Sequence, residues 1–80
     1  MVDFYIDGTT RKNDKGTIAL TRTSKGWTQR AVRTNDDDDI SVDFAATVNR
    51  DYVSNETEEQ IMEWVRLDFK SWSVRAPDLG

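Results

Sequence analysis

The chain has 80 residues, which suits one domain and excludes a two-domain enzyme or a barrel large enough to enclose a substrate. It contains neither cysteine nor histidine, which excludes a disulfide framework, a thiolate zinc site, a cysteine nucleophile and the commonest general base near neutral pH. The formal net charge of −4 conceals two segments of opposite charge: residues 8–34 hold seven basic groups and one acid, whereas residues 35–63 hold ten acids and one arginine.

The chain begins with the pattern of a strand followed by a loop. Apolar and polar residues alternate over about residues 2–7, which predicts a half-buried strand. The next segment, residues 8–16, is bracketed by glycines and rich in turn formers, so we expect a polar loop there.

A hairpin is predicted next. About residues 17–23 are rich in β-branched side chains, Ser24-Lys25-Gly26 can form a tight turn, and about residues 27–33 return as a third strand. A pairing of Leu20 with Ala31 would place these two residues on the core face together with Ile18 and Trp27. A register slip of one residue would reverse that face.

The acidic segment that follows predicts a loop and a fourth strand. Residues 34–39 contain four adjacent aspartates, which repel one another and are poor strand formers. Over about residues 40–48 apolar side chains alternate with polar or small ones, which favours a strand. The alternating apolar residues are Ile40, Val42, Phe44, Ala46 and Val48.

The C-terminal part predicts a helix over about residues 56–72, with a tail at 73–80. Thr57 and Gln60 fit a capping box, and glutamates occupy the first turn. A helical wheel puts five apolar residues on the core side: Ile61, Met62, Val65, Phe69 and Trp72. The predicted fold is a single two-layer α+β domain, in which a four-stranded antiparallel meander precedes one C-terminal amphipathic helix.

The acids suggest a surface that imitates nucleic acid. In extended chain, carboxylates two residues apart lie about 6.6 Å apart, close to the spacing of phosphates along one strand. Such a surface would attract a basic groove. The alternatives are a solvated loop or a loose cation site, although the EF-hand spacing is absent. The candidate partner-binding acids are Asp36, Asp37, Asp38, Asp39, Asp43, Glu56, Glu58, Glu59 and Glu63.

Two apolar residues of the predicted helix accompany these acids. The wheel places Trp64 and Leu67 outside the core arc, beside charged positions, which is typical of interface anchors. The alternative is that they pack under the tail or a neighbouring loop.

The basic hairpin supports an opposite hypothesis, direct nucleic-acid binding. Trp27 or Tyr5 could stack on a base, but the protein as a whole is acidic, unlike most nucleic-acid binders. The candidate phosphate-binding residues are Arg22, Lys25, Arg30 and Arg33, assisted by Gln29 and neighbouring hydroxyls. For an enzyme the residues form no triad, G-x-S-x-G motif or phosphate loop, so we expect no catalytic activity, no cofactor and no metal.

The overall plan resembles small phage-encoded inhibitor proteins, the anti-CRISPR proteins among them. The resemblance covers the meander, the acidic loop, the absence of cysteine and histidine, and the helix that begins Glu56-Thr57-Glu58-Glu59-Gln60-Ile61-Met62-Glu63-Trp64. It implies a stoichiometric inhibitor that occupies the basic surface of a host nucleic-acid-handling or defence complex, a protein or ribonucleoprotein. The acids would seat the inhibitor, and Trp64 with Leu67 would anchor it.

Location and assembly follow from weaker signals. No segment reads as a secretion signal, and the longest apolar run is three residues, so we expect a cytoplasmic protein without a membrane span. We expect a monomer or homodimer. A further alternative is a self-assembling structural phage protein that associates through an exposed strand edge, the first or fourth strand of the meander.

Overall fold

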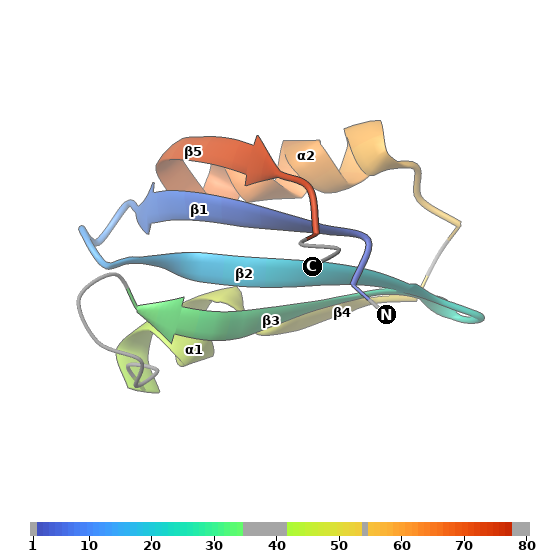
Figure 1. Ribbon diagram of the computed structural model, residues 1–80, viewed down its shortest axis with the longest axis horizontal. Coiled ribbons are helices and arrows are strands. Elements are labelled where there is room, and N and C mark those ends of the chain that lie inside the picture. Colours follow the sequence, from blue (N-terminus) through green and yellow to red (C-terminus); the bar gives the residue numbers. More distant parts are fainter. Residues whose placement is uncertain (1, 35–41, 54, 78–80) are drawn as a thin grey trace.

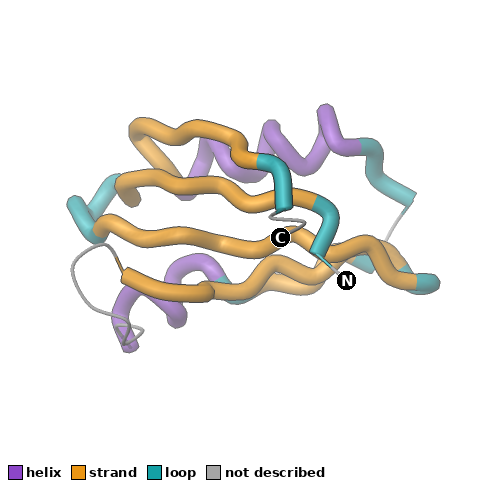
Figure 2. The backbone as a smooth tube through the Cα atoms, viewed as in Figure 1, coloured by secondary structure: helices purple, strands orange, loops and turns teal. Residues whose placement is uncertain are grey.

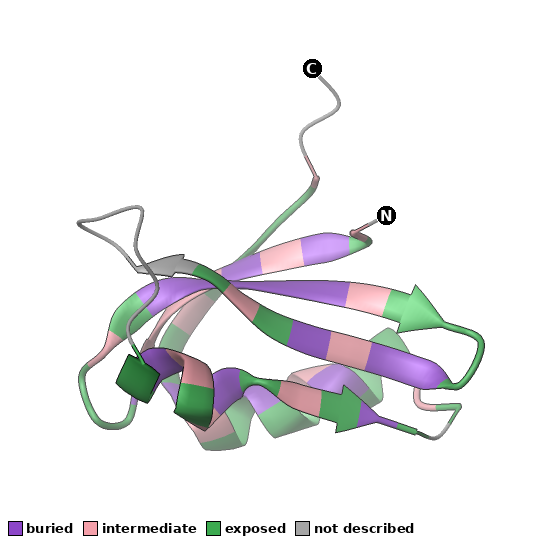
Figure 3. Ribbon diagram, turned by 90° about the horizontal axis from the view of Figure 1, so that it is seen from below, coloured by how far each residue is buried: buried purple, intermediate pink, exposed green. Residues whose placement is uncertain are grey.

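A computed structural model describes residues 2–34, 42–53 and 55–77. The elements are, in chain order, β1 (Phe4–Thr10), β2 (Lys15–Thr23), β3 (Gly26–Thr34), α1 (Val42–Val48), β4 (Arg50–Tyr52), α2 (Glu58–Asp68) and β5 (Phe69–Arg75). The strands form one antiparallel sheet in the order β4-β3-β2-β1-β5, and both helices lie on the same face of it (Figures 1 and 3). The fold is therefore α+β, with a fifth strand and a second helix beyond the predicted meander and helix.

The β2–β3 hairpin has a different register from the predicted one. Leu20 pairs with Gln29 instead of Ala31, because the loop contains only Ser24 and Lys25. Gly26 begins β3 with φ of 144°, a backbone conformation that favours glycine. A shift of two residues keeps Ile18, Leu20, Trp27 and Ala31 on the predicted core face.

The predicted loop at 8–16 is mostly strand. β1 extends to Thr10 and β2 begins at Lys15, so the turn is short (Figure 2). Gly8 pairs with Gly16 on one side and with Trp72 on the other. A Cβ at Gly8 would lie 2.7 Å from Cδ1 of Phe69, so the close approach of β5 requires glycine here.

The predicted strand at 40–48 is wrong over its described part, which forms helix α1. Phe44 and Val48 are fully buried, whereas Val42 is 82% exposed and Ala46 is exposed. Burial thus follows a spacing of four residues instead of two, as a helix requires. Phe44 and Val48 fit both periods, so the alternation of apolar residues could not distinguish a helix from a strand.

The predicted helix at 56–72 is also too long, because α2 ends at Asp68 and the chain continues as β5. The turn between β1 and β2 caps the end of α2: the Arg11 guanidinium donates to the carbonyls of Leu67, at 3.1 Å, and Arg66, at 2.5 Å. Phe69 takes an extended conformation and is fully buried. Residues 73–75, predicted as tail, complete β5.

The core lies between the sheet and the two helices. Phe44 and Phe69 meet edge to face with ring centroids 6.3 Å apart, as do Phe4 and Trp27 at 5.9 Å. The sheet edges are β4 and β5, so β1, predicted as an edge in a simple meander, lies inside. The core cluster consists of Phe4, Ile6, Ile18, Leu20, Trp27, Phe44, Val48, Tyr52, Ile61, Val65 and Phe69.

Candidate protein-binding surface

Helix α2 begins as the sequence predicts. Thr57 accepts a hydrogen bond from the Gln60 backbone, and the Gln60 side chain accepts one from the Thr57 backbone, which completes the capping box. Ile61 and Val65 point into the core. Away from these two residues, α2 exposes Glu59, Glu63, Trp64 and Leu67, with the exposed Arg66 beside them, and we call the first four residues the α2 surface.

Two apolar side chains stand out on the α2 surface. Trp64 is 41% exposed and Leu67 is 64% exposed, which agrees with their predicted positions outside the core arc. Exposed apolar side chains of this size beside carboxylates are a feature of protein interfaces.

Strand β4 contacts the exposed indole of Trp64. The rings of Tyr52 and Trp64 have centroids 6.0 Å apart, and the guanidinium carbon of Arg50 lies 5.4 Å from the Trp64 ring. Two residues of a three-residue strand therefore contact the indole, which stays partly exposed to solvent.

A polar cluster of Gln29, Arg50, Tyr52 and Asp68 supports these contacts. Arg50 forms an ion pair of 3.0 Å with Asp68, whose side chain is almost fully buried. The Tyr52 hydroxyl donates to the Gln29 side chain at 3.0 Å, and Gln29 donates to the carbonyl of Val48 at 2.7 Å. Gln29 thereby ties β3 and β4 to the end of α1.

Burial and charge shift the pKa values of two members of the polar cluster. Burial of the phenol raises the pKa of Tyr52 above its ordinary value, against the opposing influence of Arg50. Burial lowers the pKa of Arg50, but its hydrogen bond with Tyr52 and the charge of Asp68 outweigh this, so its pKa is raised. Arg50 is therefore a permanent cation beside Trp64.

Glu56 does not belong to the α2 surface, although the sequence placed it with the partner-binding acids. Its backbone carbonyl accepts a hydrogen bond of 2.8 Å from the Trp27 indole. Its Oε2 atom is buried and has no hydrogen-bond partner among the residues that the structure describes. Glu56 thus helps to connect β3 to the segment that precedes α2.

The other predicted acids lie apart from the α2 surface. Asp43 is exposed in the first turn of α1 and lines a shallow depression with Lys12 and Asp14. Glu58 is exposed at the start of α2, beside an apolar groove that includes Val74. The run Asp36–Asp39 lies outside the described residues.

The predicted basic residues lie on the hairpin, and Arg22, Lys25 and Arg30 are exposed. The Arg22 guanidinium carbon lies 5.4 Å from the Trp27 ring, and Lys25 is exposed in the turn. Arg30 forms an ion pair of 2.7 Å with Asp51. The backbone of Arg33 pairs with Thr17 in the sheet.

Two residues proposed for the nucleic-acid surface are buried instead. Gln29 is fully buried within the polar cluster, so it cannot donate to a phosphate. Trp27 is 3% exposed and forms part of the core, so it cannot stack on a base.

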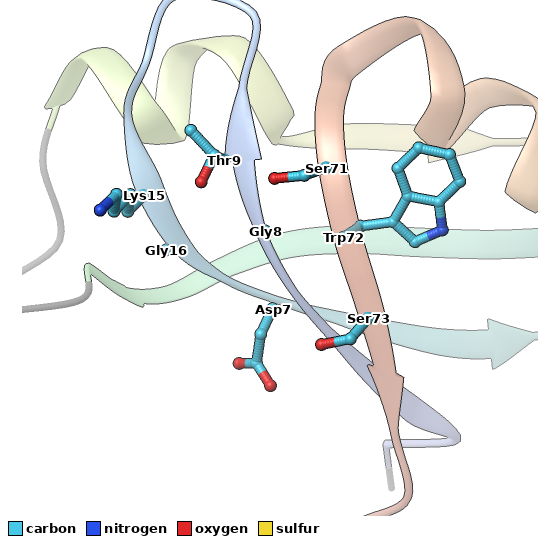
Figure 4. Close-up of a pocket in the computed structure, with 8 residues that line it drawn as sticks. All are labelled: Asp7, Gly8, Thr9, Lys15, Gly16, Ser71, Trp72 and Ser73. Atoms are coloured by element: carbon cyan, nitrogen blue, oxygen red, sulfur yellow. The ribbon is translucent and has the colours of Figure 1, made fainter.

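The sheet face opposite the helices carries a shallow depression of about 390 Å³ (Figure 4). Hydroxyl groups of Thr9, Ser71 and Ser73 surround it, with Asp7 and Lys15 nearby. Asp7 pairs with Arg75 at 2.9 Å and accepts a hydrogen bond from Thr17 at 2.5 Å. Its charge is therefore largely balanced within the protein.

In the part of the chain that the structure describes, the two charged segments pack against each other, since β3 pairs with β4 and Gln29 donates to the carbonyl of Val48, but a single ion pair joins them. Among the described residues, Arg30–Asp51 is the ion pair that joins the basic segment to the acidic one, and Arg50–Asp68 and Arg75–Asp7 involve other parts of the chain. Of the described exposed acids, Asp43, Glu58, Glu59 and Glu63 lie on the helices, whereas Asp51 lies on β4 and Asp3 precedes β1. Helix α2 therefore carries three exposed acids and one exposed cation, Arg66.

Neither helix in the described ranges is long and apolar enough to cross a membrane. Comparison of the chain with protein-family models, curated proteins and solved structures gave no match. The geometry of the α2 surface is therefore the basis for assigning a function.

Proposed function

We propose that this protein is a non-catalytic binding domain that docks through the α2 surface onto a basic, nucleic-acid-binding surface of a partner protein or ribonucleoprotein. It acts there as a stoichiometric inhibitor, because it competes with nucleic acid for the same surface. The observation that carries this proposal is the preorganised, half-exposed Trp64, held by Arg50 and Tyr52.

The chemistry of the α2 surface supports both its role in docking and its preference for a basic partner. A tryptophan whose orientation is already fixed loses little conformational entropy on binding, so it makes an effective anchor. Leu67 extends the apolar area, while Glu59 and Glu63 add negative charge that attracts a basic partner and speeds association.

A site-specific cross-linking experiment tests the docking surface. A photo-reactive benzoylphenylalanine replaces Leu67 on the α2 surface or, as a matched exposed control, Lys25 on the hairpin. Each variant is mixed with nuclease-treated bacterial lysate and irradiated, and cross-linked proteins are identified by mass spectrometry.

The expected result is a protein captured from position 67, not from position 25, and displaced by added oligonucleotide. Capture from position 25 alone would contradict the α2 surface as the docking site. Capture that added oligonucleotide does not reduce would contradict nucleic-acid competition.

A second candidate function is direct nucleic-acid binding by the hairpin, favoured by the exposure of Arg22 and Lys25 at its end. Fluorescence anisotropy of a labelled oligonucleotide at low salt tests it. Arg22→Ala with Lys25→Ala should abolish binding if this function is real. An undetectable shift with the unmodified protein would exclude it.

A further inference from the structure

We propose that β5 is a dimerisation strand, through which two copies of this chain pair edge to edge, antiparallel, about a two-fold axis. β5 is an edge strand of seven residues with no proline. The opposite edge, β4, has only three residues and offers little backbone to pair with. An edge of the length of β5 is a template for a further strand.

The outer backbone of β5 is available for such pairing. Among the described residues, the backbone of residues 70–74 forms no hydrogen bond outside its ladder with β1. The described irregularity lies at one end, where the shift between Thr9 and Thr10 leaves Lys70 as a bulged residue. The remaining length is regular.

Two apolar side chains mark this edge. Val74 is 57% exposed, and Trp72 is partly buried against the core. In Figure 4 the Trp72 indole lies on the side of β5 that faces away from β1. Beside Val74, a groove of about 300 Å³ continues between β5 and α2, lined by Phe4, Met62 and Pro77 among others.

The sequence of β5 is complementary to itself in one register. A two-fold axis at Ser73 sets Trp72 of one copy opposite Val74 of the other, twice by symmetry, and aromatic side chains pair well with β-branched ones across strands. The same axis sets Arg75 opposite Ser71 and Lys70 opposite Ala76, so no like charges face each other.

Charge at the two ends of β5 is also complementary. Lys70 is exposed at the start of the strand, whereas Asp3 and Glu58 line the groove at its end. Antiparallel pairing brings Lys70 of one copy to the acidic groove of the other. The ammonium of Lys70, which donates to Asn13 in its own chain, then gains a carboxylate partner.

Analytical ultracentrifugation from micromolar to millimolar protein tests the proposal. The unmodified protein should show a monomer–dimer equilibrium, and Val74→Lys should weaken dimerisation by about tenfold or more. Val53→Lys is the matched control, since Val53 is 81% exposed beyond the opposite edge strand, and it should leave dimerisation unchanged. At concentrations where all three proteins are monomers, thermal melts of both variants should match that of the unmodified protein.

A charge exchange identifies the register. Lys70→Glu should weaken the dimer, and adding Glu58→Lys to that variant should restore it. A monomer at every concentration, equal dimerisation of the Val74→Lys variant, or absence of rescue by the exchange would overturn the proposal. These substitutions leave the α2 surface intact, so either proposal can fail without the other.

Discussion

Arg50 stacks against Trp64 while it pairs with Asp68: its guanidinium carbon lies 5.4 Å from the centroid of the indole, and its Nη2 lies 3.0 Å from the carboxylate. Asp68 is the last residue of α2, and Arg50 is the first residue of β4. The pair therefore fixes α2 against the edge of the sheet and sets the orientation of Trp64 at the same time.

Loss of Arg50 should destabilise the fold. Arg50→Ala leaves the buried Asp68 carboxylate without its ion-pair partner and should lower the free energy of unfolding by about 1–3 kcal/mol. Arg30→Ala is the matched control, because its ion pair with Asp51 is solvent-exposed and should contribute less than about 1 kcal/mol. Urea denaturation measures both, and equal losses would contradict a structural role for the Arg50–Asp68 pair.

The raised pKa of Tyr52 predicts a loss of stability in alkali. The unfolded chain releases the phenol proton near its ordinary pKa of 10.0, whereas the folded chain retains it to higher pH. The stabilisation is therefore complete below pH 10 and is lost as pH rises through the folded pKa.

Absorbance at 295 nm measures this titration in a Tyr5→Phe background, where Tyr52 is the remaining phenol. Urea denaturation between pH 8 and 11, compared with Tyr52→Phe, measures the corresponding loss of stability. If the Tyr52 phenol titrated at its ordinary pKa, the assigned burial would be wrong.

Gly8→Ala should destabilise the sheet by about 1–3 kcal/mol, because the new methyl group collides with the Phe69 ring and the Ser71 carbonyl. Ser73→Ala, at an exposed position of the adjacent strand, serves as the control and should change stability by less than about 0.5 kcal/mol. Thermal denaturation followed by circular dichroism compares them. An unchanged melting temperature for Gly8→Ala would contradict the close approach of β5 to β1.

Substitution of two tryptophans should distinguish a residue needed for stability from a residue needed for binding. Trp27→Ala removes a core side chain and its hydrogen bond to the Glu56 carbonyl, so it should cost about 3–5 kcal/mol. Trp64→Ala removes a half-exposed side chain and should cost less than about 2 kcal/mol. Trp64→Ala should nevertheless abolish capture of the partner. Normal capture by a folded Trp64→Ala variant would contradict its role as anchor.

The parts of the fold that local patterns determine could be predicted from the sequence. The first three strands and the start of α2 have clear periodicity and capping residues. The end of α2 could not be predicted, because its carbonyls are capped by Arg11, a residue distant in sequence, with no glycine or proline at the boundary. The pattern of residues 40–48 predicts a strand where helix α1 forms, because the buried positions Phe44 and Val48 satisfy both periods.

Only the helical part of the candidate surface could be predicted from the sequence. The helical wheel identified Trp64 and Leu67, since their exposure depends on the periodicity of α2 alone. Arg50 and Tyr52, which hold Trp64, lie in a strand too short to show a pattern. The sequence suggests Gln29 as a phosphate contact, because a polar residue in a strand gives no sign that tertiary partners bury it.

The most direct test of the docking proposal is the association rate of the captured partner, measured by stopped flow as a function of salt. Glu63→Gln removes one negative charge from the α2 surface, and Asp51→Asn removes one from strand β4, outside that surface. We predict that Glu63→Gln slows association and flattens its salt dependence, whereas Asp51→Asn changes neither. Equal effects of the two variants, or none from Glu63→Gln, would contradict docking through the α2 surface.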